Sequence, residues 1–428
     1  MLTSAKPRAE LRPSGLSRAS VQLVGGLIFA VLLPWLLRVL LEPEAASLAS
    51  QQNSLLGTMA ALVAGHVFVR SLTSFPGIRA GYYVIPTFAI AYGVTLTVFF
   101  FLRFDYSRVQ FLGSFALCSA WYLWVFLWRR RSRTLRIGVV PAGEVEVLYG
   151  IAGVEWVALN DPALVPSGLD AIVADLRADM SDERERFLAE SAIAGMPVYH
   201  VKQIQESLTG RVEIEHLSEN NFGSLIPGLA YVTIKQIVDL TAALVMMVVL
   251  FVPGLFVALA IKADSRGPVM FRQRRMGYRG AVFTVHKFRT MTHRRTDSED
   301  EARNSAITVE GDARITRIGK FLRRTRIDEL PQIINILRGE MSWIGPRPEA
   351  EVLSIWYEKE LPYYRYRHIV RPGITGWAQV NQGHVANVDE VLWKLHYDFY
   401  YIKNFTPWLD MLITFRTVHT ILTGFGSR

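Results

Sequence analysis

The sequence predicts a membrane protein of the α+β class, and three observations support this fold class. Four long apolar runs fill the first third of the chain, alternating strand and helix patterns follow, and the last part carries the whole excess of positive charge. Long apolar runs predict membrane-spanning helices, whereas alternating strands and helices predict a parallel sheet. These patterns divide the chain into residues 1–135, 136–222, 223–262 and 263–428.

The four apolar runs predict an N-terminal block of four transmembrane helices. They cover Val21–Leu41, Leu55–Val69, Tyr82–Leu102 and Val109–Trp128. The first and third approach the roughly 20 residues that a membrane-spanning helix needs, whereas the second is shorter and contains His66. The linker Glu42–Gln52 has acidic residues and no basic ones. Because Lys and Arg are enriched in cytoplasmic loops, both ends of this block are expected in the cytoplasm.

Residues 136–222 predict a small, Rossmann-like α/β domain with a parallel sheet. The expected strands are Leu135–Val140, Val154–Leu159, Ala171–Ala174 and Pro197–His200. A helix is expected at Asp182–Ala194, with Ser181 as its N-cap. The first strand is followed by Pro-Ala-Gly-Glu-Val-Glu and not by Gly-x-Gly-x-x-Gly, so no dinucleotide site is expected. A structural or regulatory spacer is the simpler interpretation.

The segment Ile237–Ile261 is apolar except at Asp239 and Thr241, and Pro253-Gly254 interrupts it. The domains on both sides are expected in the cytoplasm, so the segment should enter and leave the membrane through the same face. Pro253 removes a helical hydrogen bond and clashes with the preceding turn. The segment is therefore expected either to turn back as a re-entrant hairpin or to span the membrane as a helix kinked at this proline.

The charge of the chain points to anionic partners. The net charge is +9, and residues 262–428 hold 27 Lys and Arg against 18 Asp and Glu. Phosphates, acidic lipid headgroups and nucleic acid all suit such a charge. The sequence has no helix-turn-helix pattern and no zinc-ligand spacing, so no nucleic-acid partner is expected. The single cysteine, Cys118, excludes an internal disulfide.

An acidic pair in a basic setting, Asp328 and Glu329, is the main candidate for catalysis. A helix is expected to begin here, with a buried face formed by Leu330, Ile333, Ile334 and Leu337. At a helix start beside cations, a carboxylate is expected to stay ionised and phosphate is attracted. Such a carboxylate can act as a nucleophile, a metal ligand or both. The alternative is that the pair only caps the helix and binds Arg324 or Arg326.

A candidate strand upstream supplies two cations. Val282–Met291 alternates apolar and polar residues, which places Lys287 and Arg289 on one face and His286 on the other. Two cations on one face can clamp a diphosphate. A solvated basic edge strand is the alternative interpretation of this segment.

Two loops downstream supply further cations. Prolines on both sides of Arg347 stiffen its loop and fix the direction of the guanidinium. Gly373 and Gly376, which follow Arg371, are expected to let the backbone approach a ligand. The candidates for holding a diphosphate are Lys287, Arg289, Arg326, Arg347 and Arg371.

A C-terminal cluster of aromatic and basic residues allows two interpretations. It consists of Trp393, Tyr397, Tyr400, Tyr401, Phe405 and Trp408 with Lys394 and Lys403. Aromatic and basic residues together suit the headgroup layer of a membrane. They equally suit a helix packed inside the domain.

These motifs resemble the bacterial sugar transferase family, the monotopic polyprenyl-phosphate phosphoglycosyl transferases. The matching patterns are, in order, Gly-Pro-Val-x-Phe-x-Gln-x-Arg, Lys-Phe-Arg-Thr-Met, Asp-Glu-Leu-Pro-Gln, Gly-Pro-Arg-Pro-Glu and Arg-Pro-Gly-Ile-Thr-Gly-Trp-Ala-Gln-Val-Asn. The resemblance covers Tyr231 to Gly424. The upstream helices and α/β domain resemble the long members, which transfer hexose-1-phosphate at the start of exopolysaccharide, capsule or O-antigen synthesis.

The resemblance implies a two-step transfer. Asp328 would attack the β-phosphorus of a UDP-sugar and release UMP, leaving a sugar-phosphoryl aspartate, and undecaprenyl phosphate would then accept the sugar phosphate. Glu329 would help to bind Mg²⁺ and handle the proton, so both carboxylates are implied metal ligands. Glucose or galactose is the sugar that the resemblance favours, with N-acetylated sugars left open.

The resemblance also implies a location. The catalytic domain would lie on the cytoplasmic face of the bacterial inner membrane, anchored by a re-entrant helix–break–helix, and a homodimer is compatible with the family. Small members usually have Ser-Pro at the break, whereas this chain has Val252-Pro253, so no serine hydroxyl can satisfy the freed backbone there. The alternative function is a catalytically inactive membrane scaffold for polysaccharide assembly, against which the intact Asp328-Glu329 pair argues.

Overall fold

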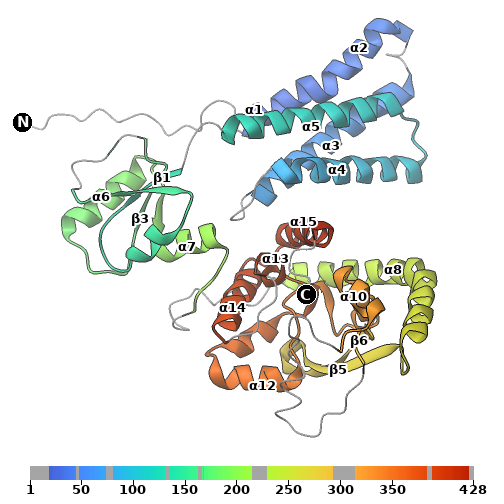
Figure 1. The fold of residues 1–428 in the computed structure, drawn as a ribbon. Helices are drawn as coiled ribbons and strands as arrows, with labels where there is room; N and C mark the ends of the chain where they lie inside the picture. The colour runs from blue at the N-terminus through green and yellow to red at the C-terminus, as the bar shows by residue number, and fades with distance from the viewer. Residues whose placement is uncertain are drawn as a thin grey trace, which may run out of the picture. The chain divides into compact units, whose positions relative to one another are not determined.

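The structure, a computed structural model, divides into two compact units, Met1–Gly210 and Arg211–Arg428 (Figure 1). It describes all residues except 1–18, 45–47, 74–80, 131–134, 162–165, 167, 215–228, 293–313, 383–387 and 424–428. The predicted boundary between residues 222 and 223 lies outside the described residues.

The four predicted apolar runs form helices in the first unit. The first run is a continuous succession of α1 (Ala19–Gly26), the π-helical stretch η2 (Leu27–Leu32) and α2 (Leu33–Leu41). The other three are α3 (Ala49–Thr73), α4 (Gly81–Leu102) and α5 (Arg108–Arg130). All four are long and apolar enough to cross a membrane. The expectation of four apolar helices is therefore confirmed, and their orientation stays a prediction.

Close contacts through glycine hold these helices together. A Cβ on Gly65 would lie 2.2 Å from the Phe88 ring, and one on Gly57 would lie 2.3 Å from Phe99. Small residues let helix backbones approach in this way. The one histidine of the second run, His66, is buried, and its Nδ1 lies 2.7 Å from the Tyr122 hydroxyl. The polar atom is thus satisfied inside an apolar core.

The α/β domain contains the four expected strands, β1 (Leu135–Val139), β2 (Val154–Ala158), β3 (Ala171–Ala174) and β4 (Val198–His200). All pairings are parallel, in the order β2-β1-β3-β4, which confirms the parallel sheet. The helical elements are η4 (Glu146–Gly150), α6 (Asp182–Ile193) and α7 (Val201–Thr209). Ser181 is the N-cap of α6, although its side chain makes no capping hydrogen bond. The closer likeness to a Rossmann fold stays a prediction.

The second unit is a mixed α and β domain that begins with a long apolar helix, α8 (Leu229–Asp264). Its further elements are β5 (Met270–Met276), η6 (Tyr278–Gly280), β6 (Val282–Phe288), α10 (Arg317–Arg324), η7 (Ile327–Gln332), α11 (Ile333–Leu337), β7 (Ser342–Ile344), α12 (Glu351–Glu360), η8 (Tyr364–Ile369), β8 (Gly373–Thr375), α13 (Trp377–Asn381), α14 (Val388–Lys403) and α15 (Pro407–Thr423). β5 and β6 form an antiparallel ribbon, whereas β7 and β8 pair in parallel.

The helix α8 is bent. Figure 1 shows its first part running along the domain and its second part turning down toward β5. Pro253 lies inside the helix, where a proline removes one hydrogen bond and kinks the axis. The predicted break is therefore a bend within one continuous helix. Its placement relative to a membrane stays a prediction.

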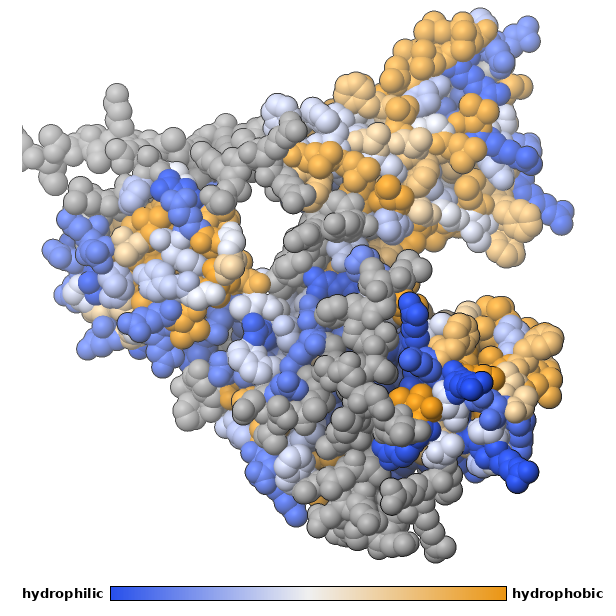
Figure 2. Space-filling model, in the orientation of Figure 1, coloured by the Kyte–Doolittle hydropathy of each residue, from blue (hydrophilic) through white to orange (hydrophobic). Residues whose placement is uncertain are grey.

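Both parts of α8 pack against the same domain. In the first part, Ala243 is fully buried in a cluster with Phe283 and Ile336. In the second part, Ile261 is buried in a cluster with Leu322. The remaining surface of α8 is largely apolar and exposed, for example at Val248, Phe256 and Leu259, and Figure 2 shows apolar residues gathered over this helix.

The helix at the acidic pair differs from the expectation. Asp328 and Glu329 lie in the first turn of the 3₁₀-helix η7, and the α-helix that follows, α11, has only five residues. The expected buried face is correct for Ile333 but wrong for Ile334, which is 37% exposed, while Ile336 is buried. A 3₁₀-helix has three residues per turn, so the periodicity of an α-helix assigns the wrong neighbours to one face.

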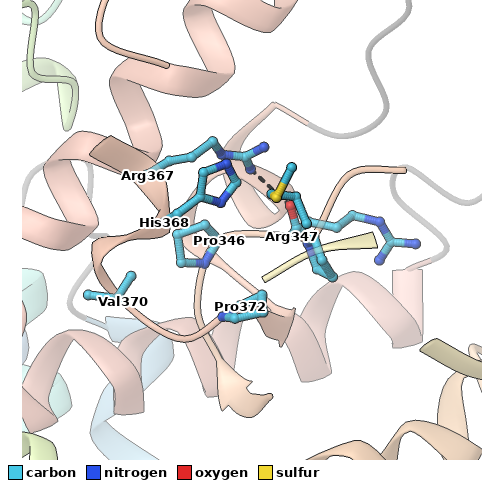
Figure 3. Close-up of a pocket in the computed structure, with 8 residues that line it drawn as sticks. Pro346, Arg347, Arg367, His368, Val370 and Pro372 are labelled. Carbon is cyan, nitrogen blue, oxygen red and sulfur yellow. Dashed lines mark hydrogen bonds between the residues drawn. The ribbon is translucent and has the colours of Figure 1, made fainter. Parts of the chain in front are cut away.

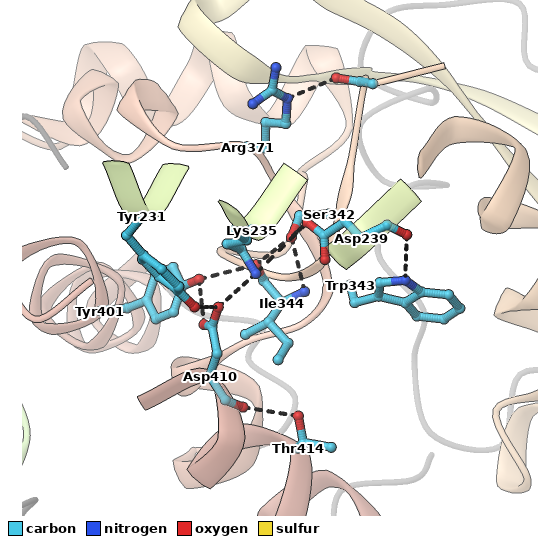
Figure 4. Close-up of polar contacts among 11 residues, drawn as sticks. Tyr231, Lys235, Asp239, Ser342, Trp343, Ile344, Arg371, Tyr401, Asp410 and Thr414 are labelled. Atoms are coloured by element: carbon cyan, nitrogen blue, oxygen red, sulfur yellow. Dashed lines mark hydrogen bonds and ion pairs between the residues drawn. The ribbon is translucent and has the colours of Figure 1, made fainter. Parts of the chain in front are cut away.

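A buried polar cluster joins α8 to the end of the chain (Figure 4). Lys235 Nζ lies 2.7 Å from Asp410 Oδ2, and Tyr231 and Tyr401 donate to the same carboxylate at 2.6 and 2.8 Å. One turn further along α8, Asp239 accepts a hydrogen bond from Ser342 at 2.6 Å. The first part of α8 is thus fixed to α15 and to β7.

The C-terminal aromatic cluster is largely interior. Tyr400 and Tyr401 are buried, and so is Lys394. Trp393 is 49% exposed. The structure therefore favours the interpretation of a helix packed inside the domain.

The buried pair between Lys235 and Asp410 gives a test of how α8 is attached. Lys235→Met leaves a buried carboxylate without its cation, and we expect the free energy of unfolding of this unit to fall by about 3–5 kcal/mol. The change is measured as the apparent melting temperature in detergent.

The control is Arg274→Ala. Arg274 binds Glu351 at 2.9 Å, but its side chain is 69% exposed, so breaking this pair should cost only about 0–1 kcal/mol. Equal losses in the two variants would contradict the assignment of Lys235 as the attachment point.

Candidate active site

Three cations meet at one oxygen of Glu329. Lys287 Nζ lies 3.1 Å from Oε1, Arg347 Nη2 lies 2.7 Å from it and Arg326 Nη1 lies 3.7 Å from it. They come from β6, from the loop after β7 and from the residue before η7. Arg326 has a left-handed backbone (φ 59°), which is uncommon for a residue with a side chain and marks the sharp turn into η7.

Asp328, the neighbour of Glu329, is buried, and one of its carboxylate oxygens has no hydrogen-bond partner in the described residues. The residue is 8% exposed, and the oxygen in question is Oδ1. A buried polar atom without a partner is rare and needs an explanation. The pair is thus asymmetric, because one carboxylate holds the cations and the other presents a free oxygen beside them.

The pKa shifts reflect this asymmetry. The guanidinium of Arg347 and the ammonium of Lys287 hold the pKa of Glu329 well below its ordinary value despite burial. Burial raises the pKa of Asp328, and the charge of Glu329 raises it further. The expectation that this setting keeps a carboxylate ionised agrees with the lowered pKa of Glu329. At Asp328 desolvation outweighs the cations and raises the pKa, so its charge state at neutral pH stays a prediction.

The cations themselves are desolvated. Burial lowers the pKa of Lys287 to about 8, although Glu329 opposes this shift. The nearby charge of Glu329 raises the pKa of Arg347. Burial lowers the pKa of Arg275, on β5, to about 10, and the charge of Arg347 lowers it further. Charges that are this well shielded from water act strongly on any anion that enters the site.

The loop that carries Arg347 is fixed by a close crossing of two chain segments. β7 pairs with β8, and a Cβ on Gly373 would lie 2.1 Å from the amide nitrogen of Gly345. A Cβ on Gly376 would lie 2.2 Å from the carbonyl oxygen of Gly345. These glycines were expected to admit a ligand. In the structure they admit the backbone just before Arg347.

A buried arginine, Arg367, supports the same loop from behind. Its Nη2 donates to the carbonyl oxygen of Arg347 at 2.9 Å and to Asp398 at 2.7 Å, and its Nη1 donates to the Tyr364 hydroxyl at 2.7 Å. Arg275 donates to the next carbonyl oxygen, that of Pro348. Sequence reasoning missed both roles, since nothing in the sequence separates an arginine that holds the backbone from one that binds a ligand.

A small pocket lies behind the Arg347 loop (Figure 3). Its lining includes Pro346, Arg367, His368, Val370 and Pro372. Figure 3 shows the Arg347 carbonyl facing Arg367 while the Arg347 side chain leads away from it. The pocket therefore belongs to the support of the loop.

Two of the five candidate cations lie elsewhere. Arg289 Nη2 donates to the carbonyl oxygen of Ser265 at 2.7 Å and its Nη1 to that of Arg266 at 3.1 Å, so it closes the turn after α8. Arg371 Nε donates to the carbonyl oxygen of Gly339 at 2.9 Å, and its guanidinium lies over the Tyr278 ring. Lys287 and Arg289 do not share a partner, because β6 ends at Phe288.

The alternative interpretation, in which the acidic pair is purely structural, fits Glu329 but not Asp328. Arg326 does bind Glu329, as that interpretation expected. Arg324 makes no such pair within the described residues and is exposed. The free oxygen of Asp328 has no structural role of this kind.

The pair suits a divalent cation that arrives with phosphate. The described residues contain no group of three or more His, Cys, Asp or Glu side chains that could hold a metal by themselves. Mg²⁺ commonly binds through one or two carboxylates together with substrate phosphates. The free oxygen of Asp328 and the carboxylate of Glu329 fit this mode.

The asymmetry of the pair predicts opposite effects of two isosteric substitutions on the unliganded protein. Glu329 has a lowered pKa, so its charge stabilises the fold at neutral pH and this contribution is lost as the pH falls below the ordinary glutamate value. Glu329→Gln should therefore cost about 3–5 kcal/mol. Asp328 has a raised pKa, so its charge costs stability at neutral pH and Asp328→Asn should leave the melting temperature unchanged or raise it.

Thermal unfolding in detergent at neutral pH measures both effects, with Glu360→Gln, an exposed carboxylate of α12, as the control. A similar loss of stability in the Asp328 and Glu329 variants would contradict the asymmetry.

Comparison with known proteins identifies the family to which this domain belongs. The family model described as "Bacterial sugar transferase" matches residues 230–424. A UDP-N-acetylgalactosamine-undecaprenyl-phosphate N-acetylgalactosaminephosphotransferase from Aeromonas hydrophila is 46% identical over 384 residues, 89% of each chain. A UDP-glucose:undecaprenyl-phosphate glucose-1-phosphate transferase from Caulobacter vibrioides is 42% identical over 47% of this chain and 74% of its own. One of that name from Escherichia coli is 39% identical over 43% of this chain and 39% of its own. The chain belongs to the bacterial sugar transferase family.

Proposed function

We propose that this enzyme transfers a sugar-1-phosphate from a UDP-sugar to undecaprenyl phosphate, giving undecaprenyl-diphosphate-sugar and UMP. The observation that carries the proposal is the buried, unpartnered oxygen of Asp328 beside three cations that meet at Glu329. The similar proteins named above are undecaprenyl-phosphate sugar phosphotransferases, which supports the general reaction. It would be the first membrane step in the synthesis of a surface polysaccharide.

The first step forms a covalent intermediate. An oxygen of Asp328 attacks the β-phosphorus of the UDP-sugar, and the bond from that phosphorus to the oxygen bridging the two phosphates breaks. UMP leaves with that oxygen, and the sugar phosphate stays bound to Asp328 as an acyl phosphate. The raised pKa of Asp328 makes its carboxylate a better nucleophile once it is ionised.

The second step releases the product. A phosphate oxygen of undecaprenyl phosphate attacks the same phosphorus, the bond to Asp328 breaks, and the carboxylate is regenerated. Glu329 lies beside the reacting centre and accepts a proton from the incoming phosphate when that phosphate carries one. In the resting protein its lowered pKa makes it a weak base, so we propose that it takes this proton only after the substrate phosphates have drawn its cations away.

Lys287, Arg326 and Arg347 stabilise the charge of the transferring phosphoryl group. Phosphoryl transfer depends mainly on alignment and on neutralising charge. In the unliganded structure these cations bind Glu329 Oε1, so they already converge beside Asp328. Asp328 and Glu329 would hold Mg²⁺ together with the diphosphate oxygens, and the ion would supply further charge neutralisation.

We propose that α8 is re-entrant. Both of its parts are buried against the same domain, through Ala243 in the first part and Ile261 in the second. A helix that crossed the bilayer would carry one of its parts away from a domain that lies in water. The positive charge of the domain favours the cytoplasmic face of the inner membrane.

The sugar most worth testing is N-acetylgalactosamine. The Aeromonas relative, which is named for this sugar, is similar over 89% of the chain and so includes the α/β domain and the apolar helices. The relatives named for glucose are similar over less than half of this chain. This proposal departs from the glucose or galactose that the resemblance to long members favoured.

The nucleophile can be tested in the first half-reaction, without undecaprenyl phosphate. With Mg²⁺ and a UDP-sugar labelled at the β-phosphate, we expect one UMP per active site and a label on Asp328, located by peptide mass spectrometry. Asp328→Asn should give neither, whereas Glu329→Gln should still become labelled, because Glu329 accepts its proton only in the second step. Turnover of Glu329→Gln with undecaprenyl phosphate should fall about 10²–10⁴-fold. Labelling of another residue, or full turnover by Asp328→Asn, would remove Asp328 as the nucleophile. Failure of every UDP-sugar to release UMP would support the scaffold alternative.

The choice of sugar is tested by kcat/KM with UDP-linked N-acetylgalactosamine, N-acetylglucosamine, galactose and glucose under the same conditions. We expect the first to be the best substrate. A higher kcat/KM for glucose or galactose would contradict the proposal on the sugar and leave the reaction unchanged.

A further inference from the structure

The short helix α10 presents an exposed basic face. Arg317, Lys320, Phe321 and Arg324 are all exposed, and their spacing of three and four residues puts them on one side of the helix. Phe321 is 60% exposed, close to the 69% of Phe256 on α8. A face with cations and an exposed aromatic ring is typical of helices that lie in the headgroup layer of a membrane.

The opposite face of α10 is packed against the last turns of α8. Leu322 is buried in a cluster with Ile261, and Ile318 packs against the same cluster. The side chain of Asp264, the last residue of α8, accepts a hydrogen bond from the Ile318 amide at 3.2 Å. The start of α10 is therefore held at the end of α8.

This position sets the depth of the basic face. The last two turns of α8 expose Phe256 and Leu259, which are 69% and 67% exposed, and Lys262 and Asp264 then end the apolar stretch. The hydrocarbon layer should end at the same level. An eight-residue helix is only about 12 Å long, so all of α10 stays close to the lipid headgroups.

The three cations of this face have no acidic partner among the residues that the structure describes. Arg323, on another side of the same helix, donates instead to the Thr290 hydroxyl at 3.1 Å. Each Lys or Arg near an anionic membrane surface strengthens binding about fivefold. The basic face thus complements anionic headgroups in charge and continues the apolar surface of α8 (Figure 2).

We infer that this face of α10 binds the headgroups of anionic phospholipids. The inference rests on the proposed placement of α8 in the membrane and is independent of the chemistry at Asp328. α10 leads through Thr325 and Arg326 directly into η7, so a lipid contact here lies next to the acidic pair. Anionic lipids therefore help to fix the height of the catalytic centre above the bilayer.

The test uses the full chain in nanodiscs that contain phosphatidylcholine and a trace of a photoreactive lipid, either phosphatidylglycerol or phosphatidylcholine with the same diazirine chain. Adducts on the peptide 317–324 are quantified by mass spectrometry. We expect a clear excess of phosphatidylglycerol adducts on this peptide. The excess should fall about fivefold for each cation removed in Arg317→Gln and Lys320→Gln. Lys359→Gln, which removes one exposed cation from α12, should leave it unchanged.

Equal labelling by the two lipids, or an excess that survives both substitutions, would overturn the inference. So would crosslinks from Lys320 to the acidic side chains of residues 297–312 in place of lipid adducts. Two readouts separate this inference from the proposed function. UMP release in detergent reports on the chemistry alone, and adducts on the α8 peptide around Phe256 and Leu259 report on membrane placement alone.

Discussion

The convergence of three cations on one oxygen of Glu329 is the interaction on which the candidate site depends. Each cation is positioned by a different structural element. Lys287 comes from the β5–β6 ribbon, Arg326 from a left-handed turn, and Arg347 from a loop held by Arg367. Because Glu329 binds all three, the neighbouring Asp328 keeps a buried oxygen that has no hydrogen-bond partner among the described residues.

The long apolar helix α8 and the candidate site share hydrophobic clusters. The cluster around Ala243 of α8 contains Phe283 of β6 and Ile333 of α11, which flank Lys287 and the acidic pair. The cluster around Ile261 contains Leu322 of α10. Removing α8 from the domain would therefore expose the residues that support the site. The packing of α8 and the positioning of the candidate catalytic groups are therefore coupled in this fold.

Much of this could be predicted from the sequence, because long apolar runs, short strands and the acidic pair are local signals. The partners of individual arginines could not. Arg289 and Arg371 have the same side chain as Arg347, but the first closes the turn after α8 and the second binds Gly339. Which anion or carbonyl an arginine meets depends on tertiary packing. The 3₁₀ geometry of η7 was missed for a related reason, since the left-handed Arg326 that precedes it has no sequence signature.

Two adjacent carboxylates in one basic site cannot both bind all of its cations. The asymmetry between Asp328 and Glu329 follows from this constraint. A carboxylate that held the cations would be too well stabilised to attack phosphorus, whereas an isolated buried carboxylate would stay protonated. Dividing the roles solves both problems. Glu329 keeps the cations in place. In the proposed mechanism, a diphosphate that enters would compete with Glu329 for these cations and bring its phosphorus beside Asp328. In that mechanism, the cations that stabilise the resting protein through Glu329 would also stabilise the transferring phosphoryl group.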